Sequence, residues 1–166
     1  MKKIFINPNL YLIFTLLIAV YINFINISPS GKYMIENFGV SSLDSCVFCS
    51  SEKILNTLTI LGEAGRNVHL QFTLYLDIIF PFSIFGFFYL KLKNTFYYLP
   101  FLALFFDLVE NTLMVLEIRK FPNISSLFLN SFIYINTLKF IFYILCLLAL
   151  TKLLKKNNTG SASTGF

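Results

Sequence analysis

The sequence predicts an all-α integral membrane protein: a bundle of four transmembrane helices with a short amphipathic helix in the first outer loop. Hydrophobic residues make up 57% of the 166 residues and charged residues only 13%, whereas soluble domains usually carry about 25% charge. Four apolar stretches come close to or exceed the roughly 20 residues that a spanning helix needs. Because unpaired backbone groups are costly in lipid, these stretches are expected to be helical.

The four stretches cover residues 10–27, 70–90, 96–116 and 127–150. The first follows a short basic start and therefore resembles a signal peptide. It is longer than the usual apolar core of roughly 7–15 residues, and no small-x-small cleavage pattern follows it, so we expect a retained helix. Residues 1–156 are predicted to form a single transmembrane domain, and 157–166 a disordered polar tail.

The first outer loop, 28–67, contains the signals of one further helix over 51–61. Ser50 or Ser51 can cap its start and Gly62 can end it. Its apolar residues recur on one face, so we expect a lid that lies on the membrane surface over the bundle. Pro81 falls inside the second stretch. It predicts a kink whose freed carbonyl is satisfied by a neighbouring group.

The distribution of basic residues predicts the orientation. With a cytoplasmic N-terminus, seven lysines face the cytoplasm and five basic residues face outward, and the short inner loop contains Lys91 and Lys93. Basic residues favour the cytoplasmic side. Both termini are therefore predicted to be cytoplasmic, in the inner (plasma) membrane. The lipid bilayer is the expected partner. No basic stripe interleaved with exposed aromatics points to nucleic acid, and no cofactor or protein partner follows from the sequence.

Charged residues inside the apolar stretches are the candidate site. Asp107, Glu110 and Asn111 stand at i, i+3 and i+4 and share one helix face. At a rise of 1.5 Å per residue, Asp77 lies roughly 10 Å below the outer side, Glu110 roughly 9 Å, Asp107 roughly 14 Å and Lys139 roughly 14–18 Å. The five side chains therefore converge in the outer half of the bundle.

Two interpretations of this cluster remain open. Lys139 can neutralise one carboxylate, and Asp107 is its best match in depth. Any other carboxylate is expected to be protonated or to bind a cation, because burial disfavours an unpaired charge. Intramembrane ionisable residues usually mark functional sites, so the cluster is a candidate catalytic site. The alternative is a structural network that fixes helix register.

The stretch before the second apolar run adds candidate substrate-binding residues, Glu63, Arg66 and His69. A guanidinium can clamp a carboxylate or phosphate through two hydrogen bonds, so Arg66 is a candidate for such a contact. Arg66 also fits an interfacial residue whose charge simply reaches water. A single histidine is a poor basis for a zinc site, and no metal site is predicted.

The ordered set Gly65-Arg66, Asp77-x-x-Phe80-Pro81, Asp107-x-x-Glu110-Asn111 and Lys139 resembles small four-helix bacterial integral membrane proteins of unassigned function. The resemblance covers about 51–150. It implies an all-helical inner-membrane protein with a polar site between the second, third and fourth spanning helices. It implies no activity.

Cys46 and Cys49 form a C-x-x-C in the first outer loop. This arrangement is similar to the quinone-dependent disulfide oxidoreductases of the bacterial inner membrane. That family uses a second cysteine pair in its second outer loop, and 119–126 contains none. The redox relay would be incomplete, so the sequence favours a local disulfide or free thiols over thiol–disulfide catalysis.

Three functional classes follow. The first is a membrane-embedded site that binds or acts on a lipid or small amphiphile, with Asp77, Asp107 and Glu110 as acid–base groups. The second is a proton- or ion-coupled transporter subunit, in which the same acids carry the ion. The third is a structural partner within a larger membrane complex.

Overall fold

The computed structural model describes residues 7–41, 43 and 49–161, with side chains as far as Lys155. Within these residues the chain is helical and contains no strand, which confirms the predicted all-α class. The helices, in chain order, are α1 (Pro8–Phe24), α2 (Gly31–Phe38), α3 (Ser51–Leu92), α4 (Tyr98–Lys120) and α5 (Ser126–Ser161).

Side-chain caps begin the first three helices. The Asn7 side chain accepts from the Asn9 backbone N–H at 3.0 Å, and the Ser30 hydroxyl from that of Tyr33 at 3.1 Å. Ser50 accepts from the Lys53 N–H at 3.2 Å, as expected for the start of α3. Such caps satisfy backbone donors that have no partner inside the helix. The short helix α2, between Ser30 and Gly39, was not predicted from the sequence.

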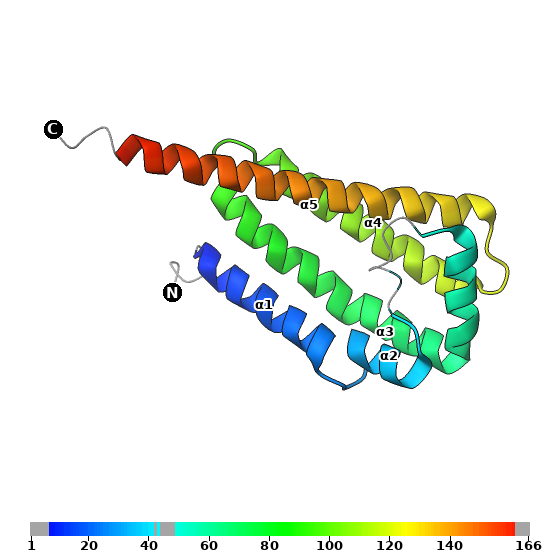
Figure 1. Ribbon diagram of the computed structural model, residues 1–166. Coiled ribbons are helices and arrows are strands. Elements are labelled where there is room, and N and C mark those ends of the chain that lie inside the picture. Colours follow the sequence, from blue (N-terminus) through cyan, green and yellow to red (C-terminus); the bar gives the residue numbers. More distant parts are fainter. Residues whose placement is uncertain (1–6, 42, 44–48, 162–166) are drawn as a thin grey trace.

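The expected helix over 51–61 and the second spanning stretch form one helix, α3, that bends at Gly62 (φ 60°, ψ −172°). This backbone conformation is essentially restricted to glycine. The first section of α3, drawn in cyan, crosses the ends of α4 and α5 (Figure 1). Its buried face, which includes Ile54 and Leu58, packs in one core with Phe132. This section therefore covers one end of the helix layer, as expected for a lid.

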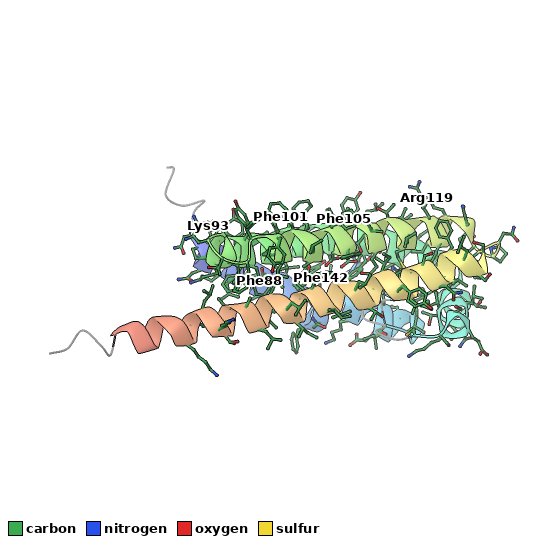
Figure 2. The ribbon with its side chains drawn as sticks, turned by 90° about the horizontal axis from the view of Figure 1, so that it is seen from above. Phe88, Lys93, Phe101, Phe105, Arg119 and Phe142 are labelled. Atoms are coloured by element: carbon green, nitrogen blue, oxygen red, sulfur yellow. The ribbon has the colours of Figure 1, made fainter. Side chains whose placement is uncertain are left out.

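Helix α3 lies at the centre of the fold and packs against α1, α4 and α5, while α4 also packs against α5. The start of α1 and the end of α5 lie at the same end of the molecule (Figure 1). Figure 2 shows Lys93 at that end and Arg119 at the other. The predicted arrangement of helix ends is therefore present. Which end faces the cytoplasm stays a prediction.

Helix α1 approaches α3 closely at two places. Thr15 Oγ1 and Ser83 Oγ share a buried hydrogen bond of 2.9 Å. A Cβ atom at Gly86 would lie 2.4 Å from Tyr11 Cδ1, so only a residue without a side chain permits this approach without a shift of the Tyr11 ring. These contacts fix α1, which forms one wall of the candidate site.

Within the part of the chain that the structure describes, three helical segments are long and apolar enough to cross a membrane: Ser51–Leu92, Tyr98–Lys120 and Ser126–Lys155. Helix α1 is apolar but has only 17 residues, so a bundle of four spanning helices stays a prediction. Large apolar side chains are exposed on several helices, among them Leu17 and Leu148. Figure 2 shows Phe101 and Phe105 on the outer side of α4. Such surfaces suit lipid rather than water.

Helix α5 is longer than the apolar stretch 127–150 that predicted it. It begins at Ser126 and continues to Ser161, into the segment 157–166 that was expected to be disordered. The expectation is corrected for 157–161, which are helical, while 162–166 lie outside the described residues. The polar composition of the tail predicts disorder, but the lysines and leucines before it favour continuation of a helix.

Candidate functional site

Pro81 creates the first feature of the site. Proline has no backbone N–H, so the carbonyl of Asp77, four residues earlier, loses its helical hydrogen bond. Asn111 Nδ2 of α4 donates to this carbonyl at 2.6 Å in a buried position. The expectation that a neighbouring group satisfies the freed carbonyl is confirmed. Asn111, predicted as a candidate catalytic residue, thus joins α3 to α4 at the level of Asp77.

Lys139 of α5 meets two acids of α4. Its ammonium contacts Glu110 Oε2 and lies 4.0 Å from Asp107 Oδ1. The Tyr143 hydroxyl, one turn further along α5, donates to Asp107 Oδ2 at 2.6 Å. Lys139, Asp107 and Glu110 are at most 6% exposed. The sequence predicted that Lys139 pairs with an acid and favoured Asp107; in the structure it meets both Asp107 and Glu110.

A pocket of about 540 Å³ adjoins this cluster. Polar side chains form its floor, and its walls are largely apolar. The floor is formed by Asp77, Asp107, Lys139 and Tyr143. The other lining residues come from α1, α2, the segment after α2, α3 and α5, and they are Ala19, Ile22, Asn23, Gly31, Lys32, Ile35, Ser41, Phe80, Ile84 and Phe140. Among the lining residues, Ile35 of α2 is 53% exposed, and Asn23 and Ser41 are exposed as well. Three of the five predicted catalytic residues therefore line one cavity.

The predicted substrate-binding residues do not line this pocket. Arg66 Nη1 donates to the Leu58 carbonyl at 2.9 Å, and the guanidinium lies 4.2 Å from the centroid of the Phe121 ring. Arg66 therefore supports the bend of α3 at Gly62, where the first section of the helix ends. Glu63 is exposed at the same bend.

His69 contacts Leu43, a described residue between α2 and α3. His69 is fully buried, and its Nε2 accepts from the Leu43 backbone N–H at 3.0 Å. An accepting Nε2 places the ring proton on Nδ1, which lies 3.3 Å from Thr73 Oγ1. Cys49 is disulfide-bonded, and Cys146 of α5 is a buried free thiol. The other member of the predicted C-x-x-C, Cys46, lies outside the described residues.

Sequence reasoning missed Glu117 and Tyr143. Glu117 is fully buried on the same face of α4 as Asp107, Glu110 and Met114. The helical spacing of these positions was the signal that could have found it. Glu117 lies just beyond the predicted apolar stretch, which ends at residue 116, whereas α4 runs to Lys120. Tyr143 follows Lys139 by one helical turn. A tyrosine within an apolar stretch gives no indication in the sequence that its hydroxyl makes a hydrogen bond to a buried acid.

Comparison of the chain with protein-family models, curated protein sequences and solved structures finds no match. Among the residues that the structure describes, no group of three or more His, Cys, Asp or Glu side chains is placed to hold a metal ion. The polar groups that line the pocket are the carboxyl groups of Asp77 and Asp107, the ammonium groups of Lys139 and Lys32, the phenol of Tyr143 and the side chains of Asn23 and Ser41. These groups can hold a polar head group by charge and hydrogen bonds, and a carboxyl can exchange a proton with it.

Proposed function

We propose that this protein is a multi-pass protein of the plasma membrane that binds a lipid or small amphiphile in the pocket above Asp77, Asp107 and Lys139. One observation supports the proposal most strongly. The pocket combines a buried polar floor with largely apolar walls, and it lies among helices that are long and apolar enough to cross a membrane. In this proposal all four apolar helices span the bilayer, both termini are cytoplasmic, and the resemblance to small four-helix bacterial membrane proteins reflects a shared architecture.

The length of α1 is compatible with the fourth span. A helix of 17 residues rises about 26 Å, slightly less than the roughly 30 Å of a typical hydrocarbon core. Modest thinning of the bilayer accommodates such a difference at a small cost. The Asn7 cap and the polar residues after Phe24 then lie near the two interfaces.

The dimensions of the pocket suit the head group and the adjoining part of an amphiphile. Pockets for small ligands commonly measure about 300–1,000 Å³ and combine apolar walls with a few polar groups. Ile22 and Ile84 offer apolar contact to a chain, worth about 0.8 kcal/mol per buried methylene. The floor offers an ammonium, a phenol and two carboxyl groups to the head.

A pair of neighbouring tryptophan substitutions tests this proposal. Ala19 lines the pocket, whereas the adjacent Val20 is exposed on α1 and does not line it. Ala19→Trp should fill the pocket and remove amphiphiles that co-purify with the protein in a mild uncharged detergent. Val20→Trp should retain them. Native mass spectrometry of the wild type and both variants gives the bound masses.

The proposal fails if the wild type carries no defined bound species, or if both tryptophan variants retain it equally. Thermal unfolding of each variant in the same detergent shows whether it is folded. A folded Ala19→Trp variant that has lost the bound mass supports the pocket as the binding site.

A further inference from the structure

Glu117 of α4 is a buried acid outside the amphiphile pocket. Its side chain is fully buried, and neither carboxyl oxygen has a hydrogen-bond partner among the residues that the structure describes. Within the same residues, no ion pair includes it. A buried carboxylate without a counter-charge is strongly disfavoured, and such a group takes up a proton instead. The surroundings of Glu117 therefore favour its protonated, uncharged form.

The charged side chains on the helices around Glu117 do not supply a counter-charge. Lys139 of α5 contacts Glu110, and the Arg66 guanidinium of α3 contacts a backbone carbonyl and the Phe121 ring. Two basic residues at the end of α4 are exposed, Arg119 and Lys120. Glu110, which is paired with Lys139, lies two turns from Glu117 on the same face of α4. A second negative charge at Glu117 would be repelled by it.

His69 is the titratable group of α3 that lies closest to Glu117 in level. Helices α3 and α4 are antiparallel (Figure 1), and the hydrogen bond between Asn111 and the Asp77 carbonyl fixes their register. Counted from this hydrogen bond, Glu117 and His69 lie within about one helical turn of the same level. The His69 Nε2 accepts from the Leu43 N–H, and a charged ring would lose this hydrogen bond, because both of its nitrogens would then be donors. His69 is therefore neutral and gives Glu117 no positive charge.

The first section of α3 covers the end of α4 that carries Glu117. Met114 and Ile118 lie on the same buried face of α4, one before Glu117 and one after it. Both pack in one apolar core with Leu58 and Leu61 of the first section of α3. Glu117 lies only about one turn before the end of α4, yet it is fully buried. The cover, rather than depth within the bundle, therefore keeps water from the carboxyl group.

We propose that Glu117 is a proton-binding site that the first section of α3 closes. In the closed form the carboxyl group holds its proton. When the section lifts, water reaches the carboxyl group, the O–H bond breaks, and the proton passes to water and leaves a carboxylate. The closed form thus holds one proton more than the open form, so a low pH favours closure and a high pH favours opening. The inference goes beyond the proposed function, because Glu117 does not line the amphiphile pocket.

Infrared spectroscopy of the full-length protein in an uncharged detergent detects the bound proton, because a protonated carboxyl group and a carboxylate absorb at separate frequencies. We expect Glu117→Gln to remove one protonated-carboxyl band at neutral pH. Glu52→Gln, at an exposed position of α3, is the matched control and should remove only carboxylate absorption. Glu117→Asp keeps a carboxyl group and should shift the band rather than remove it, which provides a second test if the glutamine variant does not fold.

Deuterium exchange of the same band measures the closure. Leu58→Ala and Leu92→Ala each shorten a fully buried leucine, the first in the core beneath the first section of α3 and the second in a separate core. Leu58→Ala should speed the exchange of the Glu117 proton at least about tenfold, because a cavity at this place favours local opening. Leu92→Ala should change the exchange rate much less, although it removes the same side-chain atoms.

Two results would overturn the inference. If neither substitution of Glu117 alters a protonated-carboxyl band, Glu117 holds no proton. If Leu58→Ala and Leu92→Ala speed the exchange equally, or neither does, the first section of α3 does not close the site. Loss of the band in Glu117→Gln together with faster exchange in Leu58→Ala alone supports it. None of these results depends on a ligand in the amphiphile pocket, so the proposed function is tested separately.

Discussion

Among single residues, Lys139 is the buried cation of the candidate site, with its ammonium against Glu110 and 4.0 Å from Asp107. Taking such charges out of water costs several kcal/mol per ion, and mutual attraction offsets this cost only while each charge keeps its partner. Loss of the lysine would therefore lower the stability of the fold mainly because buried carboxylates would remain without their cation.

We expect Lys139→Met to lower the free energy of unfolding by about 3–5 kcal/mol, because it leaves buried carboxylates without their cation. Lys139→Met combined with Glu110→Gln should recover most of this loss. Thermal and denaturant unfolding in detergent measure both variants and Glu110→Gln alone. Lys152→Met, at an exposed position of α5, is the matched control. Strictly additive effects of the two substitutions would show that Lys139 and Glu110 are not coupled.

The convergence of these residues could be predicted because helix rise converts sequence position into depth. The choice between Asp107 and Glu110 could not, since depth ignores rotation about the helix axis and the reach of a long side chain. Glutamate is one methylene longer than aspartate, so Glu110 contacts Lys139 although its position along α4 was expected to be nearer the outer side than that of Asp107. Arg66 could not be placed either, because its partner is a backbone carbonyl that becomes available only where α3 bends.

At the scale of helices, α3 continues as one helix although its regular backbone geometry is interrupted at two residues. Gly62 changes its direction, and Pro81 removes a backbone hydrogen bond at the level of the site. A glycine before an apolar stretch usually indicates the end of a helix, so the sequence predicted two separate helices here. The bend persists because the buried face of the first section packs against α4 and α5. Tertiary packing of this kind leaves no local signal in the sequence.

The hydrogen bond from Asn111 to the Asp77 carbonyl should matter only because Pro81 is present. Asn111→Leu leaves that carbonyl buried without its donor, which costs about 1–3 kcal/mol. In a Pro81→Ala background the N–H of residue 81 can bond the carbonyl. The same substitution should then cost much less. Unfolding of the four proteins in detergent gives the coupling between the two positions. An equal cost of Asn111→Leu in both backgrounds would contradict this account.

For the whole molecule, the helix ends divide into two sets. The start of α1, the turn between α3 and α4 and the end of α5 lie together, opposite the first section of α3 (Figure 1). The lysine distribution predicts that the first set is cytoplasmic. The pairing of helix ends thus follows from the fold, while the direction across the membrane follows only from the sequence.

Cysteine labelling tests this orientation. Asn56→Cys and Asn94→Cys place exposed thiols at opposite ends of the molecule. An impermeant thiol reagent added to intact cells should label the first, and should label the second only after lysis. Native Cys49 is disulfide-bonded and Cys146 is buried, and the unsubstituted chain measures the background. The reverse pattern would invert the assigned topology.

In the proposed membrane topology, the ion pair between α4 and α5 also bears on how the chain enters the bilayer. Synthesis proceeds from the N-terminus, so Asp107, Glu110 and Glu117 are made before Lys139. Each acid disfavours insertion of α4 by about 2.5–3.5 kcal/mol when it lies near the centre of a helix. Only the short segment 121–125 separates the two helices, so they can insert together as a hairpin with their charges already matched. A nascent chain that stops before Lys139 should accordingly leave α4 outside the hydrocarbon.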